Sequence, residues 1–187
     1  MLKKLLYPVL FLSFLPAAVF AQSDKVVSYG SDLTPEEQIV VFRDFPLPEN
    51  VKPSEIKSLK VTNEEEWSLL RGLIPDDQIG TKAISSIYVE RLNIGEGIKA
   101  ETKNLTYITP HILANAMTTA GVSDAKIFAT APQPVSGTAA LTGVYKCYEE
   151  LSGRRLSSYA KRTAAQELIQ TADLGEKFGK EQMAILV

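Results

Sequence analysis

Residues 97–131 read GIKAETKNLTYITPHILANAMTTAGVSDAKIFATA, which is the pattern of a strand, a helix and a second strand. In residues 97–108 charged side chains alternate with smaller or apolar ones, so one face should be covered and the other partly wet. A Thr-Pro pair begins the helix and Gly121 ends it. Residues 125–131 are short and apolar. The unit therefore predicts two parallel strands joined by a right-handed crossover.

The neighbouring segments extend this unit to a sheet covered by helices. Residues 81–92 are rich in β-formers, and a loop at 93–97 predicts a β-hairpin with the strand at 97–108. A short strand is expected within residues 22–30. Capping boxes at Thr34/Glu37 and Asn63/Glu66 predict two further helices. The expected fold class is α+β (or α/β), with a small mixed sheet.

The first 21 residues have the features of a secretory signal peptide. Two lysines precede a short apolar run, and Ala21 is a small residue suited to signal peptidase. The run is shorter than the ~20 apolar residues that a membrane helix needs, although an uncleaved anchor remains the alternative. We expect a mature chain from Gln22 with no stable membrane span. It would be extracytoplasmic: secreted, cell wall-associated or periplasmic.

Composition excludes several classes of function. Loss of Lys3 and Lys4 changes the net charge from −2 to −4. The mature chain therefore lacks the excess of positive charge that is typical of proteins that bind nucleic acid. The chain has one cysteine, Cys147, and one histidine, His111, too few for an internal disulfide or a four-ligand Cys/His zinc site. We expect no metal and no cofactor. Cys147 should be a packed thiol, with a Cys147–His111 nucleophile pair as the alternative.

The sequence suggests a division at the end of the last globular helix. Residues 22–151 are expected to form the α+β domain, and residues 152–187 a helical C-terminal segment. The segment from Arg154 carries an apolar stripe and ends on apolar residues, where a free terminus is usually polar. We expect it to depend on a protein partner or on sequence beyond a truncated end.

Two blocks of the sequence resemble a known family. They are residues 78–90, QIGTKAISSIYVE, and residues 131–143, APQPVSGTAALTG. Both are similar to the exported bacterial proteins of the domain of unknown function 1002 family, also called YpuA-like. The resemblance covers roughly residues 25–150. It implies an exported location and no established activity, so it carries over no functional residues and no catalytic residue.

The predicted topology gathers polar residues at one edge of the sheet. The ends of parallel strands 97–108 and 125–131 should meet the start of strand 81–92 there, near Thr109 and His111. A helix beginning at Ser136-Gly137-Thr138 would direct free N–H groups toward an anion, and a lysine would add positive charge. The alternative is simple helix capping and a solvated lysine. The candidate ligand-binding residues are Thr81, Lys82, Ser136, Gly137 and Thr138.

A polar row on the covered face of strand 97–108 has two explanations. Thr102, Asn104 and Thr106 would line a pocket, with Ser85 opposite Asn104 if Leu92 opposes Gly97. Alternatively they hydrogen-bond to helix ends or water and serve the fold.

Two functions of different classes follow. The first is a non-enzymatic binding module for an envelope component, a protein partner or a small anion. The second is a hydrolase or transferase that acts on an envelope polymer or anionic small molecule at the Lys82/Ser136 edge. A convergent nucleophile, base and oxyanion hole would favour the enzyme, and an apolar groove without them would favour the binding module.

Overall fold

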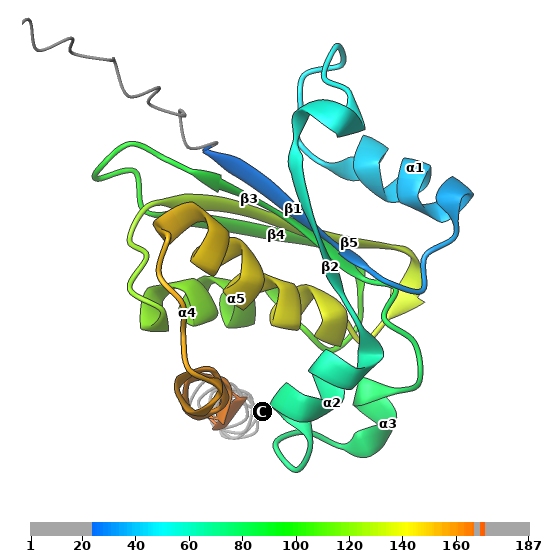
Figure 1. Cartoon of the computed structure of the whole chain (residues 1–187), viewed down its shortest axis with the longest axis vertical. Coiled ribbons are helices and arrows are strands. Elements are labelled where there is room, and N and C mark those ends of the chain that lie inside the picture. The colour runs from blue at the N-terminus through cyan, green and yellow to red at the C-terminus, as the bar shows by residue number, and fades with distance from the viewer. Residues whose placement is uncertain (1–23, 167–168, 171–187) are drawn as a thin grey trace, which may run out of the picture.

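The computed structural model describes residues 24–166, 169 and 170. These residues form a five-stranded sheet with helices on both faces (Figure 1). The elements are β1 (Lys25–Gly30), α1 (Pro35–Asp44), a 3-10 turn η1 (Pro53–Glu55), β2 (Lys57–Val61), α2 (Asn63–Leu70), α3 (Asp76–Ile79), β3 (Ser86–Arg91), β4 (Ile98–Leu105), α4 (Pro110–Thr119), β5 (Ala125–Val135) and α5 (Thr138–Ser152). Residues 158–166 are also helical.

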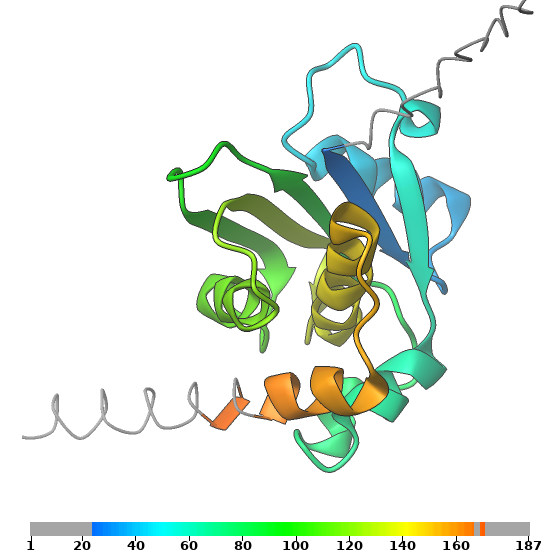
Figure 2. The ribbon, with the colours of Figure 1, turned by 60° about the vertical axis from the view of Figure 1, so that its left-hand side comes forward.

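The sheet has the strand order β2-β1-β3-β5-β4. The outer pairs β1–β2 and β4–β5 are parallel, whereas β3 is antiparallel to both of its neighbours. Helix α1 covers one face of the sheet, and α4 and α5 cover the other (Figure 2). The expected mixed sheet of an α+β fold is therefore confirmed.

Both faces of the central strands are apolar, and this accounts for their position in the interior of the sheet. On β3, Ile87 and Val89 belong to the core beneath α4 and α5, whereas Tyr88 belongs to the smaller core beneath α1. Phe128 on β5 packs against that smaller core too. Alternate side chains of a strand point to opposite faces, so a strand apolar on both faces suits the sheet interior.

The predicted hairpin between 81–92 and 97–108 is wrong, because β5 lies between the two strands. Strand β4 is at the edge, where Lys99, Glu101 and Lys103 are exposed. A strand with one charged face is suited to an edge, and charge there also opposes unwanted strand pairing. The supposed pairing of Ser85 with Asn104 is therefore wrong as well. The parallel β4–α4–β5 unit is confirmed.

Strand β5 is longer than expected and continues through Pro132 and Pro134 to Val135. Its pairing with β3 ends at Thr130. Proline has no backbone N–H to donate, and the two prolines lie beyond this point, where no β3 carbonyl needs a donor. The β4–β5 register shifts between Lys103 and Leu105, around Asn104 with φ 58°. This irregularity keeps the ends of the two strands paired.

A second parallel unit, β1–α1–β2, escaped the sequence analysis. Strand β2 is an edge strand with two lysines in five residues, a weak strand pattern. The capping box Thr34/Glu37 of α1 is confirmed. The second box is formed by Thr62 and Glu65 instead of Asn63 and Glu66, which leaves Glu66 for another role.

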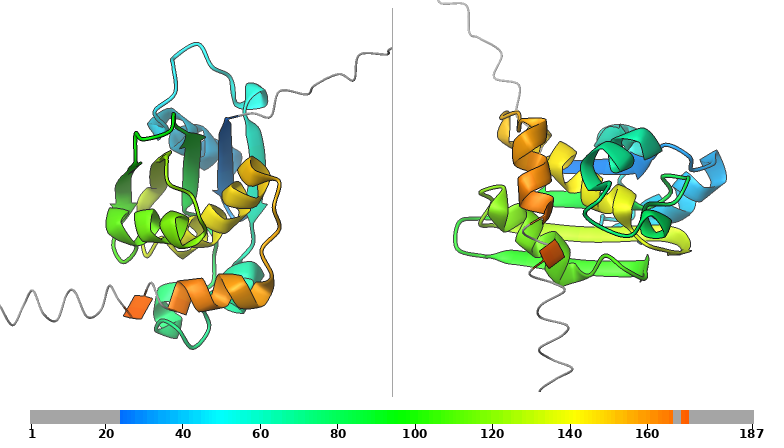
Figure 3. Two further views of the ribbon diagram at one scale, coloured as in Figure 1. Left: turned by 90° about the vertical axis from the view of Figure 1, so that its left-hand side faces the viewer. Right: turned by 90° about the horizontal axis from the view of Figure 1, so that it is seen from below.

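The C-terminal segment packs against its own domain as far as the structure describes it. Ala165 and Ile169 are buried in the same core as α4 and α5. Arg162 donates hydrogen bonds to the carbonyls of Leu69 and Arg71, so residues 158–166 lie beside α2 (Figure 3). The expectation that this segment depends on a partner is wrong for these residues. Residues 171–187, and the predicted signal at 1–21, lie outside the described part.

Within the described residues, none of the helices combines the length and the apolar character needed to cross a bilayer.

Candidate functional site

The five predicted ligand-binding residues line one pocket of about 380 Å³. Thr81 and Lys82 lie on the loop between α3 and β3, and Ser136, Gly137 and Thr138 lie at the start of α5. Glu66 of α2 and Ser85 complete its deeper part, and Asp77 is exposed at its mouth. We call this the Glu66 pocket. The sequence thus predicted a convergence of two segments more than fifty residues apart.

The loop that carries Thr81 and Lys82 is held by backbone and side-chain contacts. Asp32 accepts a hydrogen bond from the amide of Ala83 at 2.7 Å, and its own amide donates to the Ala83 carbonyl at 3.0 Å. Gly30 lies so close that a Cβ there would be 2.2 Å from that carbonyl oxygen. Trp67 donates to the Gly80 carbonyl at 3.0 Å. The rim of the pocket is therefore fixed by β1 and α2.

The fold requires a glycine at position 137. Gly137 has φ 99°, and a Cβ there would lie 3.0 Å from Cβ of Ile108 and 3.1 Å from Cδ1 of Leu105. Its left-handed conformation lets the chain enter α5, whose first turn then packs against Ile108. The glycine is explained without any ligand, so it gives no independent indication of one.

A buried glutamate dominates the pocket, and the sequence analysis missed it. Glu66 is 1% exposed, its Oε1 accepts from the Thr138 hydroxyl at 2.7 Å, and its Oε2 accepts from the Asn63 amide at 3.2 Å. Burial raises the pKa of its carboxyl to about 7, against the opposing effect of these two hydrogen bonds. A pattern could have revealed it, because Glu66 lies one helical turn before the buried Leu70.

The hydroxyls beside Glu66 form a short hydrogen-bonded chain. The Ser136 and Thr138 hydroxyl oxygens are 3.3 Å apart, and Thr138 contacts the carboxylate. Ser85, just before β3, accepts from the amide of Ala140 at 2.9 Å and so caps α5. The arrangement can move a proton between Ser136 and Glu66 through Thr138. The Thr138 hydrogen is donated to Glu66, so Ser136 is the hydroxyl that can instead donate to a ligand beside Lys82, which is exposed.

Other residues expected near this edge do not line the pocket. Thr109 caps α4 by accepting from the amide of Ile112, and exposed His111 contacts Asn115 on the same helix. Cys147 is fully buried among core residues, and burial raises the pKa of its thiol well above its usual range. The burial of Cys147 confirms the prediction of a packed thiol. The Cys147–His111 pair is not formed.

Two members of the predicted polar row, Asn104 in β4 and Thr106 just after it, serve the pairing with β5. Asn104 donates to the Ala131 carbonyl at 2.9 Å, and the Thr106 hydroxyl donates to the Val135 carbonyl at 3.1 Å. Thr106 also borders the Glu66 pocket. Among the described residues, no three His, Cys, Asp or Glu side chains are grouped so that they could hold a metal ion.

Comparison with known proteins places the chain in a family. A family model described as "Protein of unknown function (DUF1002)" matches residues 29–187. The chain is also 41% identical over 167 residues to "Uncharacterized protein YpuA" of Bacillus subtilis (strain 168), a match that covers 89% of this chain and 56% of that protein. The chain thus spans about half the length of the curated relative that it matches. No solved structure matches it significantly. The expected resemblance is therefore confirmed, and the chain belongs to the DUF1002 family.

Proposed function

We propose that this protein is an exported, non-enzymatic binding module that holds a small anionic group in the Glu66 pocket. The observation that carries the proposal is the convergence of Lys82, the Ser136 hydroxyl and the start of the fifteen-residue helix α5 on one pocket. Lysine, hydroxyl donors and a helix N-terminus each favour a negative group. Export rests on residues 1–21, whose features are those of a signal peptide.

Binding of an anion in this pocket would be linked to the protonation of Glu66. When Glu66 is ionised, its charge repels an anion. When it is protonated, the repulsion is lost and the carboxyl can donate a hydrogen bond. Because its pKa is about 7, both forms are populated near neutral pH. Affinity for an anion should therefore fall as the pH rises through about 7.

Calorimetry with phosphate, sulfate and acetate tests this proposal. At least one of the three should bind more tightly at about pH 5.5 than at about pH 8.5, and Glu66→Gln should abolish the difference. Lys82→Ala should weaken binding by roughly threefold to tenfold, as expected for loss of one partly solvated charge. Lys103→Ala is the matched control, because Lys103 is an exposed lysine that pairs with Asp44 away from the pocket. Binding unchanged by Lys82→Ala would contradict the proposal.

The chain Ser136–Thr138–Glu66 favours a second function, a hydrolase or transferase acting on an envelope polymer. The Ser136 oxygen would add to the carbonyl carbon of an ester while its proton passes to Thr138 and the Thr138 proton passes to Glu66. The carbon–oxygen bond to the leaving alcohol would then break, and that alcohol would take the proton back from Glu66 through Thr138. Water, or an acceptor hydroxyl in a transferase, would release the acyl group from Ser136 by the same steps in reverse. Ser136→Ala would then abolish turnover of an ester substrate, whereas it should only weaken anion binding, because Lys82 and the start of α5 remain. Unchanged turnover in that variant would exclude this function.

Export has its own test. The intact mass of the protein recovered from culture medium or envelope fractions should correspond to a chain that begins at Gln22. A mature chain that keeps Lys3 and Lys4 and stays with the membrane would contradict export by cleavage. Failure of this test would leave the binding proposal standing.

A further inference from the structure

Helix α1 exposes two adjacent apolar residues on its outer side. Ile39 is 52% exposed and Val40 is 46% exposed, whereas Val41 is buried beneath the helix. The outer side of α1 is open, because α4 and α5 pack on the opposite face of the sheet (Figure 2). Among the described residues four large apolar side chains are exposed, and Ile39 and Val40 are the two that are neighbours in the sequence.

The intrinsic preferences of a helix do not explain these two side chains. Isoleucine and valine are β-branched and lose side-chain freedom in a helix, so alanine, glutamate or lysine suits an exposed helical position better. Apolar surface left in water is also unfavourable. Apolar residues that lie together within a charged rim mark contact sites more often than scattered ones do. The pair therefore indicates that α1 packs against something.

Charged residues on either side of the pair indicate what that is. Glu36 precedes Ile39 by three residues, Arg43 follows Val40 by three, and both charged residues are exposed. Because residues three and four apart share one side of a helix, these four residues form a single outer stripe. The six ion pairs of the described residues include neither Glu36 nor Arg43. The helix dipole accounts for an acidic first turn and a basic last turn, but not for the apolar pair between them.

The stripe is complementary to itself when two copies of α1 run antiparallel. Its positions are symmetric about the midpoint between Ile39 and Val40, with opposite charges at the two ends. An antiparallel second copy therefore places its arginine opposite Glu36, its glutamate opposite Arg43 and its apolar pair against this one. A parallel copy would instead bring like charges together. Because both copies use the same patch, the antiparallel contact closes as a two-fold dimer.

We propose that the stripe of α1 binds a second copy of this chain as an antiparallel two-fold dimer. The stripe consists of Glu36, Ile39, Val40 and Arg43. Helix α1 has 10 residues and is about 15 Å long, so the contact is smaller than that of a stable dimer and the association is weak. No residue of α1 lines the Glu66 pocket, and the dimer does not depend on the function proposed for that pocket.

Sedimentation velocity of the purified protein at about 10 μM to 1 mM tests this proposal. The protein should shift from monomer to dimer as its concentration rises. Ile39→Lys keeps an aliphatic stem and suits a helix, but it places two ammonium groups at the centre of the contact. It should weaken the dimer by about tenfold or more. Ile94→Lys is the matched control, because Ile94 is 99% exposed on the loop between β3 and β4 and should not affect the dimer.

Charge reversal tests the antiparallel arrangement. Arg43→Glu and Glu36→Arg should each weaken the dimer, because each brings like charges together at both ends of the contact. Both positions are exposed, so both variants should fold. An equimolar mixture of the two variants should dimerise again, since every facing pair is then of opposite charge. The proposal would be overturned by a parent protein that stays monomeric at about 1 mM, a dimer that survives Ile39→Lys or is lost in Ile94→Lys, or a mixture of the reversed variants that stays monomeric.

Discussion

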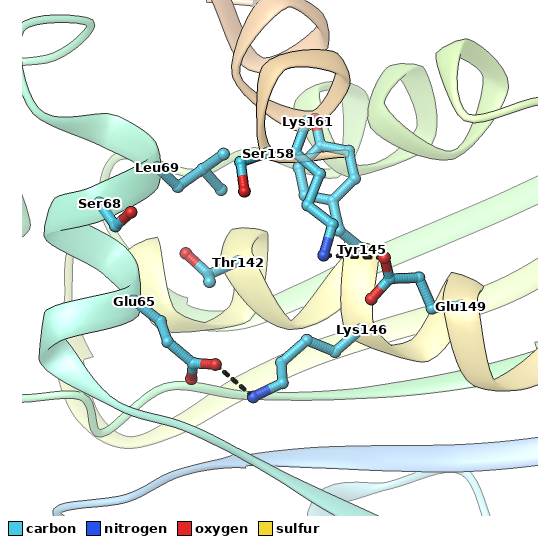
Figure 4. Close-up of a pocket in the computed structure, with 9 residues that line it drawn as sticks. All are labelled: Glu65, Ser68, Leu69, Thr142, Tyr145, Lys146, Glu149, Ser158 and Lys161. Atoms are coloured by element: carbon cyan, nitrogen blue, oxygen red, sulfur yellow. Dashed lines mark hydrogen bonds and ion pairs between the residues drawn. The ribbon is translucent and has the colours of Figure 1, made fainter. Parts of the chain in front are cut away.

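The two pockets on either side of α2 contrast in how their buried polar groups are satisfied. In the Glu66 pocket, Glu66, Asn63 and Thr138 hydrogen-bond to one another. The second pocket, which we call the Tyr145 pocket, has a volume of about 280 Å³ and lies between α2, α5 and residues 158–161 (Figure 4). Its lysines and glutamates are paired, and the Thr142 and Tyr145 hydroxyls behind its wall are buried without a partner among the described residues. The helices are the same for both, since α5 supplies Thr138 to one pocket and Thr142, one turn later, to the other.

Adjacent glutamates on α2 show the same contrast in their titration. Burial raises the pKa of Glu66 to about 7. For Glu65, hydrogen bonds and the charges of Lys146 and Lys161 outweigh burial and lower the pKa. Neighbouring residues of a helix point in different directions, and here one enters an apolar interior and the other meets lysines. The comparison teaches that burial brings the titration of one glutamate close to neutral pH, whereas lysine contacts lower the pKa of its neighbour on the same helix turn.

Gly30→Ala should disrupt the Glu66 pocket, and we expect it to reduce stability more than the other substitutions that follow. The new Cβ would lie 2.2 Å from the Ala83 carbonyl oxygen, so the loop carrying Lys82 must move. We expect a loss of about 3 to 4 kcal/mol in the free energy of unfolding, measured with denaturant. Emission from Trp67, the single tryptophan, should shift because its indole N–H bonds this loop at Gly80.

Gly143→Ala is the comparison for that variant. Its Cβ would meet side-chain atoms of Ile87 and Ser28 at 3.0 Å, and side chains give way more readily than backbone. The free energy of unfolding should fall by less than in Gly30→Ala, and Trp67 emission should be unchanged. A Gly30→Ala protein as stable as Gly143→Ala would show that the loop is not held by β1.

The pH dependence of stability should distinguish the two glutamates. Because the pKa of Glu66 is raised from 4.5 to about 7 by folding, its contribution is fully present below about pH 4.5 and is lost as the pH rises through 7. At 1.36 kcal/mol per pKa unit, the loss is about 3 kcal/mol. The difference in unfolding free energy between the parent and Glu66→Gln should change by this amount across the window. A constant difference would refute the raised pKa.

Lys161→Met should have a smaller effect than these, because it removes one charge from the rim of the Tyr145 pocket and keeps the aliphatic stem. The Lys161–Glu149 pair is about one quarter exposed, so its loss should destabilise the protein by about 1 kcal/mol. Lys99→Met is the matched control, since its pair with Glu96 spans 3.9 Å and is more exposed. Thermal unfolding in both variants measures the difference. Equal shifts in the two variants would show that the rim charges do not stabilise the fold.

The local patterns of the sequence predicted the elements better than their pairing. The alternation in residues 97–108 and the Thr34/Glu37 capping box both correspond to observed elements. The hairpin failed because a loop of suitable length does not fix which strands pair. Strand β5 lies in the sheet interior, with Ile127 and Ala129 buried on one face and Phe128 partly buried on the other, and this follows from tertiary packing.

The Glu66 pocket was partly predictable and the Tyr145 pocket was not. Parallel strands bring their carboxyl ends together, so Lys82 and Ser136 could be placed at one edge from topology alone. Glu66 was missed because three glutamates at a helix start resemble partners of the helix dipole. The Tyr145 pocket depends on residues 158–161 folding back onto α2 and α5, which no local pattern specifies.

The unfolding free energies of Thr138→Val and Thr142→Val test the central contrast most directly. The same chemical change is made at two buried positions one turn apart on α5. Thr138→Val removes the 2.7 Å hydrogen bond to Glu66 and should cost about 1 to 3 kcal/mol, whereas Thr142→Val removes a hydroxyl without a partner and should cost less than about 0.5 kcal/mol or stabilise the protein. Equal losses in the two variants would contradict the account.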